Sequence, residues 1–151
     1  MKYAHLIKLT VFSYENEGSQ PVLDAFLMFF PFNLQDNKVD FRKTNAAGFN
    51  ESKINIFEAA LTKANLVSQF LKNLLNNLDE NQKNTILAQL ESRLDKNLDF
   101  FLRFDKDLWI NEKKLALTDS GKCFHLKISI AAFPKKREIA LNVINNLFSE
   151  K

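Results

Sequence analysis

Apolar and polar residues alternate along the middle of two segments far apart in the chain, residues 3–14 and 122–132. In the first segment, Ile7, Leu9 and Val11 are separated by Lys8 and Thr10. A period of two sends successive side chains to opposite faces of a sheet. The alternation therefore predicts a strand in each segment, with one apolar face and one more polar face.

A second periodicity, of three and four residues, predicts helices between and after those strands. The clearest runs over residues 65–78, where seven apolar residues fall on one face of a helix. Asp79 can cap a following helix, whose apolar stripe runs over residues 86–94. We expect two more helices, a short one over residues 21–30 and a last one from Pro134 to about residue 148.

Four shorter segments complete the predicted elements. Strands are expected at residues 98–104 and 113–117, and weaker ones at residues 38–43 and 53–57 around a loop at Gly48. Strands and helices follow one another without a plausible linker, and 151 residues suffice for one substantial core. The expected fold is α+β: a single domain over residues 1–151, with a mixed or antiparallel sheet of about five or six strands and about four helices mainly on one face.

Positive charge is concentrated at the C-terminal end. Residues 122–151 contain six Lys and Arg against two Glu, a net charge of +4, whereas the whole chain carries only +3. Lys135, Lys136 and Arg137 follow Pro134 directly, where the positive end of a helix dipole disfavours cations. With free backbone N–H groups, they would make a seat for a phosphate. The alternative is three solvated side chains.

Catalytic and metal-binding patterns are weak. Cys123 and His125 share a strand face but supply only two ligands, and we expect His125 to be badly placed to activate the thiol. A divalent-dependent nuclease would use Asp99, Asp105 and Asp107, although nearby cations are more ordinary partners for them. With three glycines, the chain has no Gly-rich phosphate loop. We therefore predict no enzyme, no metal and no cofactor.

Compartment follows from two observations. A single cysteine excludes an intramolecular disulfide and fits a reducing compartment. The most apolar stretch, residues 22–32, is too short to span a bilayer. We expect a soluble, cytoplasmic protein without a membrane partner.

The polar faces of the predicted strands carry both aromatic and cationic residues. If these faces are coplanar, the sheet presents aromatic and cationic side chains together: Phe12, Phe101, Lys8, Arg103, His125 and Lys127. Aromatic rings that stack on bases, set among cations that bind phosphates, are typical of sheets that bind single-stranded RNA. The alternative is that a layer of helices covers this face.

Several segments resemble a small archaeal RNA-binding protein family described as predicted exosome subunits, over nearly the whole chain. They are Leu23-Asp-Ala-Phe-Leu, Phe30-Pro-Phe, Leu90-Glu-Ser-Arg-Leu-Asp, Leu102-Arg-Phe-Asp-Lys and Ile130-Ala-Ala-Phe-Pro-Lys-Lys-Arg-Glu. That family is similar in fold to the large-subunit ribosomal protein that holds 5S ribosomal RNA, which implies a mixed sheet packed by helices on one side.

The resemblance can be followed at individual positions. Arg103, Asp105 and Lys106 match the family's Leu-Arg-Leu-Asp-Lys segment. Pro134, Arg137 and Glu138 match its Tyr-Pro-x-Arg-Arg-Glu segment. Two departures stand out: Asp107 replaces a Gln, and the Gly48 loop matches the family's Gly-Asn-Pro motif only in part.

Together, the charge distribution and the resemblance predict a non-catalytic RNA-binding protein, associated with the exosome, other RNA processing or ribosomal machinery. The residues expected to contact RNA are Arg103, Lys106, Lys127, Lys135, Lys136, Arg137, Phe101 and Phe12. The alternative is a protein–protein adaptor or homodimer that uses an exposed sheet edge or exposed phenylalanines and binds no RNA.

Overall fold

A five-stranded sheet forms the centre of the molecule in the computed structural model, which describes residues 2–47, 53–119 and 121–149. The strands lie in the order β2-β3-β1-β5-β4, and every neighbouring pair is antiparallel. They are β1 (Ala4–Tyr14), β2 (Asp40–Ala47), β3 (Lys53–Leu61), β4 (Asp99–Asp105) and β5 (Cys123–Ile130). The strand count and the α+β class agree with the sequence-based expectation.

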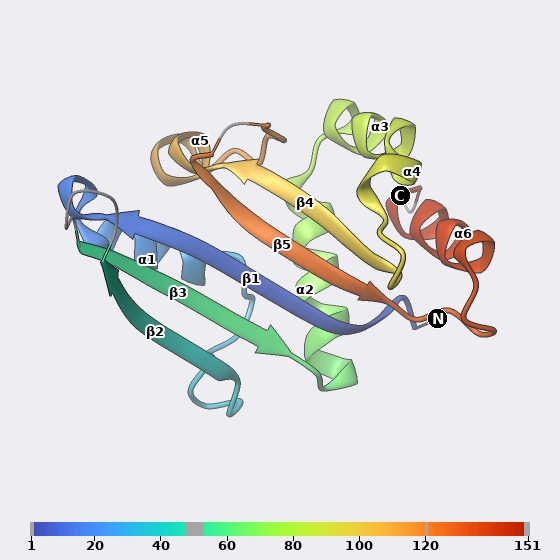
Figure 1. Ribbon diagram of the computed structural model, residues 1–151, viewed down its shortest axis with the longest axis horizontal. Coiled ribbons are helices and arrows are strands. Elements are labelled where there is room, and N and C mark those ends of the chain that lie inside the picture. The colour runs from blue at the N-terminus through green and yellow to red at the C-terminus, as the bar shows by residue number, and fades with distance from the viewer. Residues whose placement is uncertain (1, 48–52, 120, 150–151) are drawn as a thin grey trace.

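The helices leave one face of the sheet uncovered (Figure 1). Two of them, α1 (Ser19–Leu27) and α2 (Ala64–Asn77), lie behind the sheet. The others are α3 (Glu80–Ala88), α4 (Leu90–Arg93), α5 (Lys106–Glu112) and α6 (Arg137–Phe148). In Figure 1, α3, α4 and α6 gather beyond β4 and α5 lies at the end where β4 finishes. None of the helices within the described residues is both long and apolar enough to cross a membrane.

The core lies between the sheet and its helices, because one set of alternating positions on each strand is apolar and faces that side. Ile7, Leu9 and Val11 of β1 are fully buried, as are Leu126 and Ile128 of β5. In α2 the predicted apolar stripe is buried from Leu66 to Leu74. The alternation and the helical period therefore located the core correctly from sequence.

The cap predicted for the second central helix is confirmed. Asp79 precedes α3, and its carboxylate accepts a hydrogen bond from the Gln82 backbone N–H at 2.8 Å. This bond satisfies one of the unpaired donors at the helix start.

One predicted boundary and one predicted strand are wrong. The last helix begins at Arg137 rather than at Pro134, which instead follows a cis peptide bond after Phe133. The strand predicted at residues 113–117 is only an isolated bridge between Phe104 and Leu117. The two weak strands are real and longer than expected, as β2 and β3. The Gly48 loop lies outside the described residues.

Sequence reasoning missed α5. Its start is fixed by Asp105, whose carboxylate accepts from the Leu108 N–H at 3.0 Å, and it ends at Lys113, which has a positive φ of 55°. Trp109 anchors the helix to the core, since its indole N–H donates to the Ala25 carbonyl at 2.7 Å. An Asp followed by an apolar pair three and four residues later was the available signal.

Candidate nucleic-acid interface

The helix-free side of the sheet, called the outer face below, brings together the residues expected from the alternation. Antiparallel partners share a face of a sheet. The register pairs Lys8 with Lys127 and Lys127 with Phe101, which places these three side chains in one row across β1, β5 and β4. A second row joins Thr10, His125 and Arg103. The predicted coplanarity is therefore confirmed.

The aromatic rings of this face are open to solvent. Phe12 and Phe101 are 39% and 40% exposed, although most of the chain's phenylalanines are buried. No helix of the described residues crosses this side in Figure 1, so the covering layer considered as the alternative is not present there. Two exposed rings on this face are available for stacking.

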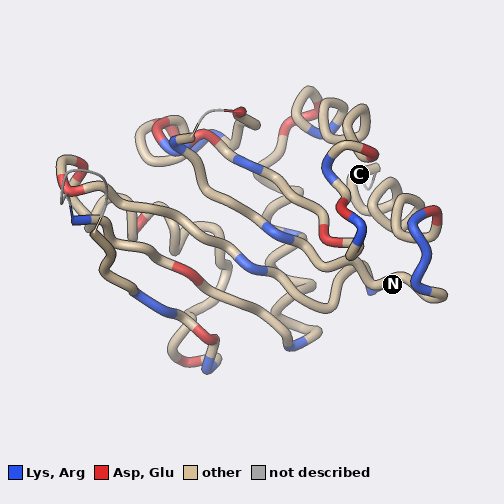
Figure 2. The backbone as a smooth tube through the Cα atoms, viewed as in Figure 1, with Lys and Arg blue, Asp and Glu red and all other residues tan. Residues whose placement is uncertain are grey.

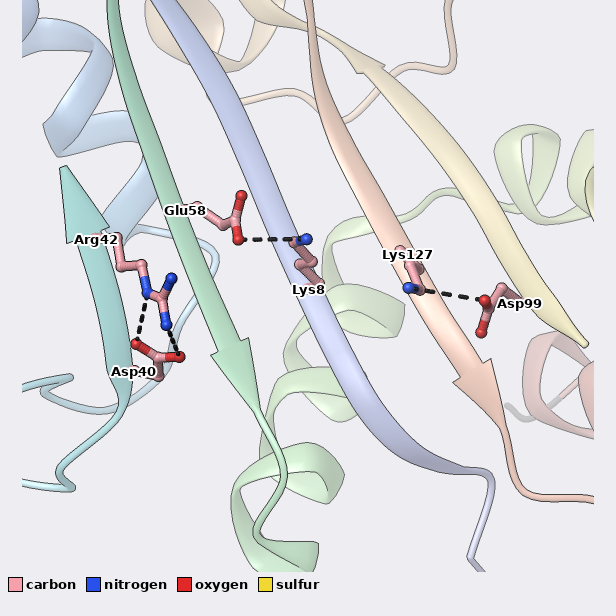
Figure 3. A network of polar contacts seen from close by, with 6 residues as sticks. All are labelled: Lys8, Asp40, Arg42, Glu58, Asp99 and Lys127. Atoms are coloured by element: carbon pink, nitrogen blue, oxygen red, sulfur yellow. Dashed lines mark hydrogen bonds and ion pairs between the residues drawn. The ribbon is translucent and has the colours of Figure 1, made fainter. Parts of the chain in front are cut away.

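Three cations of the outer face are paired with acids: Lys8 and Lys127 with acids of a neighbouring strand, and Arg42 with an acid of its own strand (Figure 3). Lys8 lies 3.3 Å from Glu58, Lys127 lies 3.7 Å from Asp99, and Arg42 lies 3.2 Å from Asp40. In the pairs of Lys8 and Arg42 both side chains are at least 33% exposed, whereas in the Lys127 pair the lysine is 36% and Asp99 16% exposed. Exposed pairs typically contribute less than about 1 kcal/mol. A phosphate can therefore compete for such a cation at small cost.

Arg103 differs from those cations, because no ion pair joins it to another described residue. Its side chain is exposed near the middle of β4. Its charge nevertheless reaches its neighbours and contributes to the lowered pKa of His125. Arg103 is thus a cation of the outer face that needs no displacement of an acid before it binds an anion.

The placement of His125 corrects one expectation. Its Nε2 lies 3.4 Å from the Sγ of Cys123, so the two residues are in contact rather than badly placed. Burial raises the pKa of the Cys123 thiol, and burial together with the Arg103 charge lowers the pKa of His125. Both shifts favour neutral groups. The pair consequently lacks the thiolate–imidazolium character of an activated nucleophile.

Lys106 lies inside the protein, with only 1% of its surface exposed. Its ammonium contacts the Glu17 carboxylate at 2.9 Å, donates to the Phe12 carbonyl and lies 5.0 Å from the centre of the Tyr14 ring. Burial alone would raise the pKa of Glu17, but hydrogen bonds from Lys106 and the Tyr14 N–H lower it. The sequence predicted that Lys106 contacts RNA. In the structure its ammonium group is instead bound to partners inside the protein.

The C-terminal cations separate into two kinds. Lys135 and Lys136 are exposed in the turn between β5 and α6. In Figure 2 this turn lies at one end of the molecule. Arg137 is tied to α4: its guanidinium donates to the carbonyls of Leu94 at 3.0 Å and Glu91 at 2.7 Å.

The same turn carries an aromatic residue that sequence reasoning missed. Phe133 is 88% exposed, far more than any other large apolar side chain among the described residues. It directly precedes Pro134 and the two exposed lysines. An aromatic residue next to a run of cations was the signal that could have singled it out.

Two of the three aspartates considered for a nuclease have structural partners. Asp99 accepts a hydrogen bond from the Ser129 hydroxyl at 2.6 Å and pairs with Lys127, and Asp105 caps α5. Among the residues that the structure describes, no three His, Cys, Asp or Glu side chains are grouped so that they could hold a metal ion.

An antiparallel sheet with helices on one side and exposed aromatic and cationic residues on the other is an architecture used by single-strand nucleic-acid-binding domains. The comparison with known proteins agrees with this class. A family model described as RNA binding matches residues 6–130, and the chain belongs to this RNA-binding family.

Known relatives resemble the chain over almost its full length. The RNA-binding protein PAB1135 of Pyrococcus abyssi is 25% identical over 142 residues, which cover 93% of this chain and 91% of that protein.

Solved structures support the fold. The crystal structure of protein AF2318 from Archaeoglobus fulgidus, a DUF54 protein, has a TM-score of 0.82 at 26% identity, covering 95% of this chain and 99% of that one. The DUF54 protein SSO0741 from Sulfolobus solfataricus has a TM-score of 0.73 at 27% identity, covering 93% and 98%.

Proposed function

We propose that this protein binds single-stranded RNA on the outer face of its sheet without catalysing a reaction on it. The observation that carries the proposal is the exposure of Phe12 and Phe101 on the same face as Lys8, Lys127 and Arg103. Membership of an RNA-binding family supports it.

Each group on this face has a role suited to its chemistry. Bases would stack on Phe12 and Phe101, and stacking on an aromatic ring contributes about 1–3 kcal/mol per base. Phosphates would contact Arg103 directly and Lys127 after displacing its partner Asp99. Such contacts read the backbone and the flat faces of the bases, so they favour RNA in general over one sequence.

The turn of residues 133–136 is proposed as a second contact. Phe133 offers a third exposed ring, and Lys135 and Lys136 offer two exposed ammonium groups. Arg137 retains at most part of its charge for RNA, because its guanidinium already binds two carbonyls and the Glu91 carboxylate. Lys106 is left out of the proposed interface because it is buried.

We propose further that the protein acts within a larger RNA-processing assembly, the exosome or ribosomal machinery, in the cytoplasm. Support comes from the sequence resemblance to predicted exosome subunits and to the fold of the protein that holds 5S ribosomal RNA. Crosslinking in the source cells, followed by sequencing of bound RNA and mass spectrometry of bound proteins, tests this. Recovery of RNA without any processing or ribosomal protein would contradict the assembly.

The homodimer alternative rests on one observation, the free edge of β2. All eight of its residues are exposed, including Phe41. Asp40, Arg42 and Lys43 lie on the same strand, and charged side chains on an edge strand oppose pairing with another copy. Light scattering over a wide concentration range separates the alternatives, since a strict monomer excludes the dimer.

The stacking contact gives the sharpest test of RNA binding. Phe101→Ala should weaken binding of a fluorescently labelled single-stranded RNA by about 5- to 100-fold, because one base loses its stacking partner. Leu27→Ala is the matched control: Leu27 is also 40% exposed but lies in α1, on the helix side. Fluorescence anisotropy at fixed salt measures both, and equal affinities for the two variants would overturn the proposed face.

A further inference from the structure

A pocket of about 340 Å³ opens where α4 meets the edge of β4. Its lining combines one aromatic ring, two arginines, an amide, a hydroxyl and one carboxylate: Gln89, Ser92, Arg93, Phe101, Arg103 and Asp119. Two of these residues, Phe101 and Arg103, belong to the outer face. The pocket therefore continues that face around the edge of the sheet formed by β4, and Figure 1 shows α4 next to this strand.

Arg93 is held in a defined position at this edge. Its Nε donates to Gln89 Oε1 at 2.8 Å and its Nη1 donates to the Phe101 carbonyl at 3.3 Å. A guanidinium has five N–H donors, so these contacts leave donors for a ligand. An arginine fixed by two bonds loses less side-chain freedom when it binds a third group.

Arg93 and Arg103 approach the pocket from different elements, one from α4 and the other from β4. Burial is the main cause of the lowered pKa of Arg93. The Asp119 carboxylate opposes this shift, whereas the Arg103 charge lowers the pKa further. Two guanidinium groups thus share the pocket with one carboxylate. Elsewhere on the outer face, Lys8, Arg42 and Lys127 each have an acid of their own.

We propose that this pocket binds one phosphate of an RNA strand between Arg93 and Arg103, while the adjoining base stacks on Phe101. The inference rests on the proposed function of the outer face and gives it a fixed anchoring point. Guanidinium groups match phosphate oxygens with paired N–H donors, which a lysine cannot do. The Gln89 amide and the Ser92 hydroxyl border the same space and can hydrogen-bond the nucleotide.

The probe is uridine 5′-monophosphate, with uridine and inorganic phosphate as separate arms. NMR with ¹⁵N-labelled protein should show shifts of the Arg93 Nε–H and of the residue 101–103 amides. We expect the strongest shifts with the nucleotide, weaker ones with phosphate, and the smallest with uridine. Equal shifts of the Arg42 Nε–H, at the far edge of the same face, would indicate unspecific anion binding and overturn the pocket.

The variant Ser92→Glu blocks the pocket without removing either arginine. Ser92 is exposed, so the substitution places a carboxylate at the pocket without disturbing the core. We expect at least a tenfold loss of nucleotide affinity and a comparable loss for single-stranded RNA. Ser68→Glu, at an exposed position of α2, is the matched control and should change neither.

The outcomes separate the two proposals. If RNA binds the wild type and Ser92→Glu equally well, and the nucleotide leaves residues 93 and 101–103 unshifted, the pocket is overturned while the outer face stands. If the wild type binds no single-stranded RNA, both proposals fail.

Discussion

The ammonium group of Lys106 lies beneath the surface, bound to the Glu17 carboxylate, whose side chain is 17% exposed. Removing one partner of such a pair leaves the other charge without its partner, which commonly costs 3–5 kcal/mol for buried pairs. We expect Lys106→Met to lower the free energy of unfolding by about 3 kcal/mol, at the low end because Glu17 retains some solvent. Urea denaturation at pH 7 measures this loss.

The pH dependence gives that prediction a second measurement. The folded-state pKa of Glu17 is lowered from its ordinary value of 4.5. Its contribution to stability is therefore present above pH 4.5 and is lost as the pH falls through the lower folded value. Lys106→Met should lose much of this acid dependence. A variant that keeps wild-type stability but binds RNA weakly would instead return Lys106 to the interface.

At the scale of elements, the Arg137 side chain links α6 to α4 and to the residue that follows it. The Arg137 guanidinium binds the Leu94 and Glu91 carbonyls and pairs with the Glu91 carboxylate at 3.2 Å. We expect Arg137→Gln to lower the free energy of unfolding by about 1 kcal/mol, because the long charged fork cannot be replaced by a shorter amide. Thermal unfolding checks this, with Lys136→Gln as a neighbouring exposed control that should leave stability unchanged.

The local sequence pattern predicted helices and strands well where burial of one face alone decides the structure. The stripe of α2 and the alternation of β1 and β5 were enough, because burial of one face decides both. The start of α6 was misplaced, because proline at a helix start and proline in a cis turn give the same local sequence. α5 was missed because its anchor is the contact of Trp109 with Ala25, 84 residues away.

The candidate site shows the same division. Alternation correctly put Phe12, Phe101, Lys127 and Arg103 on one face, since a strand's period fixes its faces. It could not show that the next cation along the chain, Lys106, turns inward, because that depends on a carboxylate 89 residues away. The contribution of Arg93 to the pocket likewise depends on how α4 packs against β4.

For the whole molecule, the net charge is only +3, although residues 122–151 alone carry +4. Affinity for single-stranded RNA should fall with salt, with a slope of about −0.7 per phosphate contact in a plot of log K against log salt. Lys135→Ala/Lys136→Ala should make the slope shallower by about 1.4 if both lysines contact phosphates. Binding at several NaCl concentrations measures this, with Lys113→Ala/Lys114→Ala, at another exposed lysine pair, as the control. Equal slopes for wild type and the turn variant would remove the turn from the interface.

The link between α6 and α4 has a consequence for any ligand of the neighbouring pocket. Arg93 lies within the four-residue helix whose carbonyls Arg137 holds. By holding α4 in place, Arg137 of α6 therefore restricts the motion of Arg93, although the two side chains are not bonded to each other. In Arg137→Gln, Arg93 would have to become ordered when RNA binds. The entropic cost of this ordering would weaken the affinity for RNA. The weaker binding of this variant would look like the loss of a phosphate contact, although every phosphate-binding side chain of the pocket is still present and only the preorganisation of Arg93 is lost.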